Sequence, residues 1–322
     1  ATVLTMQPED PYGYGRIVRD ESGNVCGIVE EKDCTDEQRA IGECNSGVFC
    51  FSAPALLGHL DKLDRNNAQG EYYLTDMLAL LAADGLTVSS MVVADNDECL
   101  GVNSRSQLAA ASKIAQRRIN DELMAGGVTM LDPDLVWVGP DCVVENDVEL
   151  LPMTMLWGTT RVSSGCIIGP NTRLTDCAIG ADNALEEVVA IETTTETGVT
   201  VGPRAYLRPG TYLCEGAHVG THVEIKKSTV GPDSKVPHLS YIGDATIGTD
   251  VNIGAGSITC NYDGVNKHQT VIGDFTFVGS NTMLVAPVKL GSNVVTGAAS
   301  CITKNVPDGA LAVERNEQRI VE

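Results

Sequence analysis

The chain has 322 residues, of which 43 are acidic and 22 are basic, so its formal net charge at neutral pH is −21. A balance this acidic excludes general nucleic-acid binding, which needs a basic surface, and any anionic substrate must be held by a local group of cations. The length fits about two domains. Only 4% of the residues are aromatic and 33 are glycine, which suits a thin solenoid better than a broad sandwich.

The 11 cysteines lie singly, without a CxxC pair, so the sequence suggests neither a zinc ribbon nor a redox pair. It contains no signal peptide and no apolar span long enough for a membrane helix. We therefore expect reduced thiols, a cytoplasmic location, and neither a nucleic acid nor a membrane as partner.

Residues 1–103 have the pattern of an α/β region. We expect strands at Val25–Glu30, Ser46–Phe51 and Thr87–Ala94, and amphipathic helices at Pro54–Leu63 and Leu74–Ala83. Nothing before residue 15 resembles a complete domain start, and no Gly-rich loop with a basic residue is present to hold a nucleoside triphosphate. The region reads as the second half of a domain.

A helix is predicted to follow. Ser104 and Gln107 form a capping box at its start, and Gly126-Gly127 ends it. Its expected apolar face comprises Leu108, Ala111, Ala115, Ile119 and Leu123. We therefore predict three parts: a partial α/β domain at 1–104, a linker helix at 105–125 and a second domain at 126–322.

From Val138 to Ile302 an aliphatic residue returns every sixth position, often followed by glycine. Neither a helix nor an alternating strand has this period, whereas a short strand plus a corner does, so the spacing predicts a parallel β-helix. The glycines are expected to permit corners with positive φ. The hexads break at Ala181–Thr200 and at Asn261–Gln269, and both segments are expected to leave the coil as loops.

Two cations fall one expected coil apart. Arg208 and Lys226 are 18 residues apart and would stack, which costs energy unless an anion bridges them, so a phosphate site is predicted. The alternative is that the two side chains diverge into water.

His238 lies between the coil positions Val236 and Ile242, where an imidazole could act as a general base near neutral pH. Simple packing of the ring is the alternative. A metal site built from His218, His222 and His238 is a further alternative, although their spacing does not match one coil. Serine and cysteine have no accompanying His–acid pattern that would indicate covalent catalysis.

The segment 260–268 is polar, rich in turn residues and interrupts the hexads. As a free loop it would be floppy, whereas as an arm reaching a neighbouring subunit it would have partners.

Several segments together carry a resemblance to a known family. They are Tyr14-Gly15-Arg16-Ile17, Gly27–Asp33, Asn66–Tyr73, Gly101-Val102-Asn103, Leu207-Arg208-Pro209-Gly210 and Asn252–Gly264. With them the whole chain resembles the GlmU family of bifunctional N-acetylglucosamine-1-phosphate uridyltransferases and glucosamine-1-phosphate N-acetyltransferases.

The resemblance implies a left-handed parallel β-helix that forms a homotrimer, preceded by part of a Rossmann-like nucleotidyltransferase domain. It implies acetyl-CoA-dependent N-acetylation of glucosamine-1-phosphate, a step toward UDP-N-acetylglucosamine for the cell wall and lipopolysaccharide. His238 matches the general base, and the amine attacks the thioester directly. The residues that match sugar-phosphate contacts are Arg208, Lys226, Tyr241, Asn252 and Lys267. Those that match acetyl-CoA contacts are Ala255, Asn261, Tyr262, Ser280, Ala298 and Arg315.

For uridylyl transfer, Gly15, Glu30, Asn45 and Asn103 match sugar-nucleotide contacts, and Asn103 also matches a ligand of Mg²⁺. The family's UTP loop, catalytic lysine and Mg²⁺-binding aspartate have no counterpart here, and one asparagine is a poor Mg²⁺ site. We therefore expect uridylyl transfer from UTP to be crippled in this chain. The alternatives to the acetyltransferase are a competent nucleotidyltransferase, a non-catalytic trimeric scaffold and a zinc hydratase.

Overall fold

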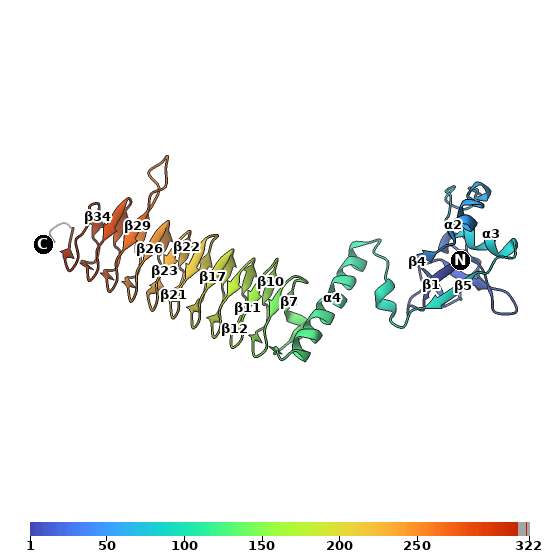
Figure 1. Cartoon of the computed structure of the whole chain (residues 1–322), viewed down its shortest axis with the longest axis horizontal. Coiled ribbons are helices and arrows are strands. Elements are labelled where there is room, and N and C mark those ends of the chain that lie inside the picture. Colours follow the sequence, from blue (N-terminus) through green and yellow to red (C-terminus); the bar gives the residue numbers. More distant parts are fainter. Residues whose placement is uncertain (315–319, 321–322) are drawn as a thin grey trace. The chain divides into compact units, whose positions relative to one another are not determined.

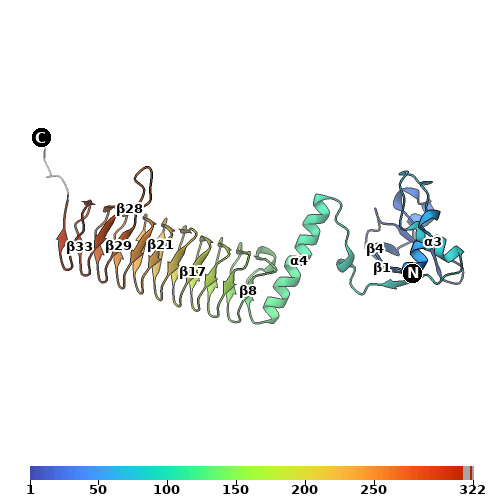
Figure 2. The same cartoon turned by 45° about the horizontal axis from the view of Figure 1, so that its top comes forward.

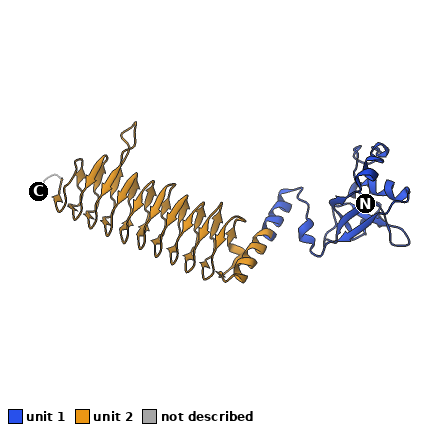
Figure 3. Cartoon of the chain, in the orientation of Figure 1, with its two compact units in different colours: residues 1–114 blue, residues 115–322 orange. Residues whose placement is uncertain are grey.

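The structure, a computed structural model, describes residues 1–314 and 320. The chain divides into two compact units, residues 1–114 and residues 115–322 (Figure 3). The division falls within helix α4 (Arg105–Ala125), whereas the sequence suggested a separate linker helix between two domains. Among the described residues no helix is both long and apolar enough to cross a membrane.

Unit 1 is built on one mixed sheet with strand order β3-β2-β4-β1-β5. Its strands are β1 (Thr2–Met6), β2 (Arg16–Arg19), β3 (Val25–Val29), β4 (Cys44–Cys50) and β5 (Ser89–Val92), and its helices are α1 (Asp36–Arg39), α2 (Ala53–Leu57) and α3 (Asp76–Ala83). Short 3-10 turns occur at Glu31–Asp33, Leu60–Lys62 and Asn96–Cys99. Strand β1, which the sequence analysis did not predict, lies between β4 and β5.

One expected helix of unit 1 is wrong. The segment Pro54–Leu63 was expected to be continuous, but α2 ends at Leu57 and a separate 3-10 turn follows at Leu60–Lys62. Gly58 caps α2 with its backbone N–H bonded to the Pro54 carbonyl. Glycine commonly ends helices in this way because it keeps little helical preference of its own.

Unit 2 is a parallel β-solenoid, so the β-helix predicted from the hexads is confirmed (Figures 1 and 2). Each coil contributes one short strand to each of three parallel sheets. Sheet I contains β6 (Thr129–Met130), β9 (Glu149–Leu150), β12 (Ile167–Ile168), β15 (Ala184–Leu185), β18 (Thr200–Val201), β21 (His218–Thr221), β24 (Lys235–His238), β27 (Asn252–Ile253), β30 (Phe277–Val278), β33 (Val295–Thr296) and β35 (Leu311–Ala312).

The other two sheets complete the triangular coil. Sheet II contains β7 (Trp137–Val138), β10 (Met155–Trp157), β13 (Arg173–Thr175), β16 (Val189–Ile191), β19 (Tyr206–Leu207), β22 (Glu224–Lys226), β25 (Tyr241–Gly243), β28 (Ile258–Cys260), β31 (Met283–Val285) and β34 (Cys301–Ile302). Sheet III contains β8 (Val143–Val144), β11 (Arg161–Val162), β14 (Ala178–Ile179), β17 (Thr193–Thr195), β20 (Thr211–Leu213), β23 (Thr229–Val230), β26 (Ala245–Ile247), β29 (Thr270–Ile272) and β32 (Val288–Leu290).

The core is a stack of aliphatic side chains, one from each strand. Leu207 pairs with Ile225 and Ile225 with Ile242 along sheet II, and all three are buried. Burying each such side chain stabilises the fold by about 1.5–3 kcal/mol. Because every coil contacts only its neighbours, the positions of polar groups on the surface follow directly from the register of the stack.

The expected loop at Ala181–Thr200 is wrong. This segment forms β15, β16 and β17 and stays in the coil. Leu174 pairs with Ala190, so this coil has 16 residues, whereas the coil from Leu156 to Leu174 has 18. The hexad phase therefore slips because a corner is shorter, not because residues leave the solenoid.

The second break, Asn261–Gln269, does leave the coil as predicted. It connects β28 to β29, and Figure 1 shows it rising out of the stack beside β29.

The corners differ from the expectation about glycine. At Gly254 φ is not in the left-handed region, but a Cβ there would lie 2.5 Å from the backbone nitrogen of Ser280 in the next coil. The requirement at this position is close approach of the backbone. Several left-handed corners are held instead by aspartate, for example Asp182 and Asp244 with φ of 57° and 51°. Aspartate tolerates this region better than most residues.

Helix α4 covers the first coil of the solenoid. Ile119 and Leu123 pack on the solenoid core as predicted, whereas Leu108 is exposed. The capping box is only half as predicted, because Ser104 accepts from the Gln107 backbone while the Gln107 side chain accepts from the backbone of Asn103.

Candidate active site

The register of sheet II brings Arg208 and Lys226 to adjacent positions in successive coils. Leu207 pairs with Ile225, and the Arg208 backbone N–H donates to the Ile225 carbonyl at 2.8 Å. Each cation already faces a carboxylate. Arg208 Nη1 lies 2.8 Å from Glu224 Oε1, and this hydrogen bond raises the pKa of the Arg208 guanidinium. An anion bound here would compete with a partner that the chain supplies.

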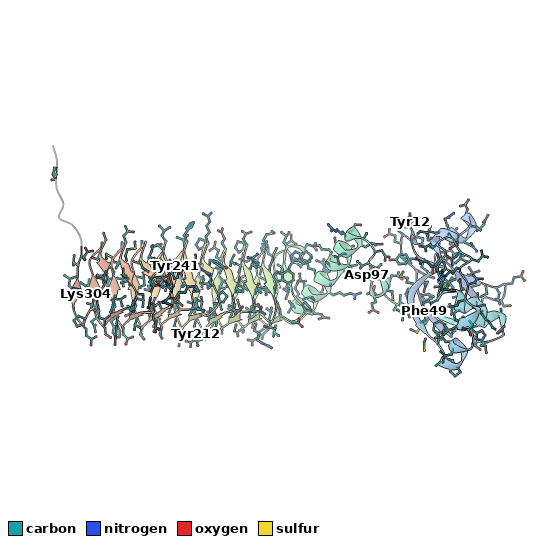
Figure 4. The ribbon with its side chains drawn as sticks, turned by 90° about the horizontal axis from the view of Figure 1, so that it is seen from above. Tyr12, Phe49, Asp97, Tyr212, Tyr241 and Lys304 are labelled. Carbon is teal, nitrogen blue, oxygen red and sulfur yellow. The ribbon has the colours of Figure 1, made fainter. Side chains whose placement is uncertain are left out.

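Lys226 faces a second carboxylate, one coil further along. Its Nζ lies 3.4 Å from Asp244 Oδ2, and its side chain is largely buried. Asn261 Nδ2 donates to the same Asp244 oxygen at 2.5 Å and lies 3.5 Å from the hydroxyl of Tyr241. Figure 4 labels Tyr241 on the solenoid. The structure thus joins Lys226, Tyr241 and Asn261, which the sequence proposed separately, and adds Asp244, which it did not.

A glycine makes room for this network. A Cβ on Gly243 would lie 2.5 Å from the Tyr241 hydroxyl and 2.7 Å from Asn261 Nδ2. Any side chain at this position would therefore collide with the polar groups that meet above it.

Lys267 reaches the same place from the projecting loop. A hydrogen bond to the Lys267 amine is the main cause that raises the pKa of Lys226, with burial opposing it and the Asp244 charge reinforcing it. The same contact lowers the pKa of Lys267. Two lysine amines that share a proton beside one carboxylate form a plausible receptor for a dianion such as a phosphate ester.

The loop itself is not floppy. Asp263 accepts from the backbone N–H groups of Val265 and Asn266 and from the His268 ring, and Tyr262 pairs with Lys267 as an isolated bridge. At its tip Val265 is 83% exposed, so the loop presents an apolar residue outside the coil.

His238 ends β24, at the corner where the chain passes from sheet I to sheet II, and it is exposed. Among the described residues no side chain is hydrogen-bonded to its imidazole. Nearby His218 bonds Thr200 Oγ1 at 2.7 Å, and burial, then the charges of Lys235 and His238, lower the pKa of His218. His218 is thus held as a neutral neighbour.

Below His238 the same corner carries small residues in the following coils. The His238 carbonyl accepts from the residue after Ala255, the Ala255 carbonyl from the residue after Ser280, and the Ser280 carbonyl from the residue after Ala298. His238, Ala255, Ser280 and Ala298 therefore form one column, named here the small-residue column. Asn252 lies beside it on sheet I, paired with Lys235 and with Phe277.

His238, Lys226 and Arg208 all border sheet II. His238 precedes β25, whereas Lys226 and Arg208 lie where β22 and β19 end. A strand of three residues such as β25 spans roughly 10 Å, so the two edges are about one sugar phosphate apart. Arg315, which the resemblance also assigns to acetyl-CoA, lies outside the described residues.

In unit 1 three of the four sugar-nucleotide candidates gather. The Asn45 backbone N–H donates to the Gly15 carbonyl at 2.8 Å, and a Cβ on Gly15 would lie 3.4 Å from both carboxylate oxygens of Glu30. Asn103 lies near this group through Gly101, whose backbone N–H donates to the Tyr14 hydroxyl. A cavity of about 560 Å³ in the same unit is lined instead by residues of β3 and α3 and the turns beside them.

Metal ligands do not converge in the described part of the chain. Residues 1–314 and 320 contain no group of three His, Cys, Asp or Glu side chains placed to hold a metal ion. The three-histidine site weighed from the sequence therefore gains no support.

The chain was compared with known proteins. No protein-family model matches it. It is 52% identical to the bifunctional protein GlmU of Carboxydothermus hydrogenoformans over 318 residues, which are 99% of this chain and 71% of that protein. It is 51% identical to the bifunctional protein GlmU of Heliobacterium modesticaldum over 321 residues, which are 100% of this chain and 70% of that protein.

Solved structures were also compared. The polysialic-acid-specific acetyltransferase NeuO shares 18% identity over 59% of this chain and 80% of its own, with a TM-score of 0.25. LpxA from Acinetobacter baumannii shares 18% identity over 56% of this chain and 70% of its own, with a TM-score of 0.26. At TM-scores this low the likenesses decide nothing about the site.

Proposed function

Since this chain belongs to the GlmU family, we propose that its solenoid transfers the acetyl group of acetyl-CoA to the amine of glucosamine-1-phosphate, giving N-acetylglucosamine-1-phosphate on the route to UDP-N-acetylglucosamine. The observation that carries the proposal is the arrangement around sheet II. An exposed imidazole stands at one edge and a group of cations at the other, with the small-residue column running on from the imidazole.

The cations would hold the phosphate. Arg208 and Lys226 approach it from successive coils and Lys267 from the loop, displacing contacts that Glu224 and Asp244 now make. Because a phosphate ester carries up to two negative charges, it competes well with single carboxylates. Tyr241 and Asn252 would contact the sugar.

The chemical step is a direct acyl transfer. The amine nitrogen attacks the thioester carbonyl carbon while His238 accepts a proton from that nitrogen. The carbon–sulfur bond then breaks, CoA leaves as the thiolate, and the thiolate takes up a proton. An imidazole exposed at the corner and free of hydrogen bonds from the described side chains is available for this role.

Acetyl-CoA would lie along the small-residue column. Side chains such as Ala255 and Ala298 leave room for a pantetheine arm against the corner, whereas larger ones would fill it. Ser280, Asn261 and Tyr262 would add polar contacts, and Arg315 is proposed as a further contact from the resemblance alone.

We propose a homotrimer as the working assembly, with the loop that carries Lys267 reaching a neighbouring subunit. The exposed Val265 at the loop tip supports this. In unit 1, Gly15, Glu30, Asn45 and Asn103 are proposed remnants of a site for the sugar nucleotide, with Asn103 toward Mg²⁺.

Release of CoA on mixing the chain with glucosamine-1-phosphate and acetyl-CoA tests the proposed reaction. We expect turnover that requires both substrates, and N-acetylglucosamine-1-phosphate as product by mass spectrometry. Absence of turnover in a correctly assembled oligomer, confirmed by sedimentation, would overturn the proposal in favour of a scaffold.

A further inference from the structure

Asp244 occupies the corner between β25 and β26, where one of its carboxylate oxygens serves two proposed substrate-binding residues. Oδ2 accepts from Asn261 Nδ2 at 2.5 Å and lies 3.4 Å from Lys226 Nζ. The carboxylate is mostly buried, with 20% of the side chain exposed. Lys226 is a proposed phosphate contact and Asn261 a proposed acetyl-CoA contact, so this single oxygen links both halves of the site.

We infer that Asp244 is a positioning residue of the acetyltransferase site, which fixes Lys226 relative to Asn261 through its shared Oδ2. The inference rests on the proposed function. Asp244 itself is not assigned to touch either substrate.

The backbone of the corner does not depend on this carboxylate. The Asp244 N–H donates to the Lys226 carbonyl at 3.0 Å, and the Thr270 N–H donates to the Asp244 carbonyl at 3.1 Å. The residue has φ of 51°, a conformation that asparagine also tolerates. Replacement of Asp244 by asparagine is therefore expected to keep the corner and remove only the charge.

The charge matters because of what surrounds Lys226. Asp244, Lys267 and Tyr241 face its ammonium, and Lys227 adds a positive charge close to Lys267. Without Asp244 the ammonium of Lys226 would face Lys267 with no carboxylate beside it. It would then lose its proton more readily and move away from its neighbour, since like charges this close repel.

Asp244 also orients Asn261. An amide can turn either end toward a neighbour, and a carboxylate accepts only from the NH₂ end. Asp244 therefore fixes which end of Asn261 faces the lysines. An asparagine at position 244 offers both a donor and an acceptor and would not enforce that choice.

The first test compares the steady-state kinetics of wild type, Asp244→Asn and a matched control, Asp182→Asn. Asp182 is a corner aspartate with φ of 57°, several coils away, so its replacement reports the cost of the substitution to the fold. For Asp244→Asn we expect kcat/KM for glucosamine-1-phosphate to fall at least about tenfold, and KM for acetyl-CoA to rise, whereas Asp182→Asn matches wild type. An unchanged or higher kcat/KM in Asp244→Asn would overturn the inference, because Asp244 would then only repel the phosphate.

The second test needs no turnover. The ¹⁵N resonance of Lys226 Nζ, assigned by its loss in Lys226→Gln, is followed against pH in wild type and Asp244→Asn. We expect the ammonium to titrate at lower pH in Asp244→Asn, and an unchanged titration would show that Asp244 does not hold Lys226. If wild type lacks acetyl transfer, the proposed function fails while this measurement still decides the contact. If wild type is active and both tests leave Asp244→Asn unchanged, only the inference fails.

Discussion

The His268 ring lies 2.7 Å from Asp263 through its Nε2, a contact that joins the two ends of the loop that leaves the solenoid. The other Asp263 oxygen accepts from the backbone N–H groups of Val265 and Asn266 at 2.8 and 2.6 Å. One carboxylate thus closes the loop, and Lys267 lies inside the closed segment. The position of Lys267 next to Lys226 depends on this closure.

The closure should depend on pH. The hydrogen bond from His268, then the backbone N–H groups of Asn266 and Val265, lower the pKa of Asp263 from 3.8 to about 2. Since the folded pKa is depressed, the carboxylate stabilises the loop above pH 3.8, and this contribution is lost as pH falls toward 2. We expect the amide protons of Val265 and Asn266 to stay protected from hydrogen exchange at pH 4 and to lose protection near pH 2.

At neutral pH, Asp263→Asn should expose those two amides to exchange, while Asp250→Asn, at an exposed corner of the coil, should not. Amides that remain protected in Asp263→Asn would show that the loop is held by other contacts.

His238→Ala should reduce kcat by about 10²- to 10⁴-fold, the usual contribution of a general base, with little change in either KM. The matched control is His222→Asn, which removes another exposed histidine of the solenoid while suiting its left-handed φ of 54°. Stopped-flow detection of CoA release gives both constants. A large rise in KM with kcat unchanged would mean that His238 binds substrate and that another group takes the proton.

Arg208→Ala should raise KM for glucosamine-1-phosphate at least about tenfold, because the guanidinium would otherwise make charge-assisted hydrogen bonds to the phosphate. Arg208→Lys should recover only part of the loss, since a lysine keeps the charge but not the fork of donors. Arg173→Ala removes an exposed arginine from the same sheet, several strands from the site, and serves as the control. If isothermal titration finds equal affinity for the substrate in wild type and Arg208→Ala, Arg208 faces only water, as the scaffold alternative predicts.

The coil register was predictable from the sequence wherever the hexads are regular. The spacing of Arg208 and Lys226 correctly placed them in adjacent coils, because a coil of 18 residues returns each side chain to the same edge. Asp244 follows Lys226 by the same 18 residues, so the spacing that found the cations contained the signal for their carboxylate partner. The sequence analysis missed it because only cations were sought.

Variation in coil length could not be predicted from the hexads. The coil from Leu174 to Ala190 has 16 residues, because the corners there are tighter, and a period search registers this as a gap. The stack of His238 on Ala255 and Ser280 was also hidden, because those coils differ in length and the loop at Asn261–Gln269 lies between them. Backbone geometry at corners, rather than side-chain pattern, decides such alignments.

Gly254 offers a test of the small-residue column that does not alter any polar group. A Cβ at this position would lie 2.5 Å from the Ser280 nitrogen, so Gly254→Ala forces the two coils apart where Ala255 and Ser280 stack. We expect a loss of about 1–3 kcal/mol in the stability of the solenoid, as for other overpacked sites, and a higher KM for acetyl-CoA than for the sugar phosphate. Gly42→Ala is the control, because a Cβ on Gly42 meets nothing within 4 Å. Equal changes in the two KM values, measured alongside chemical denaturation, would place acetyl-CoA away from this corner.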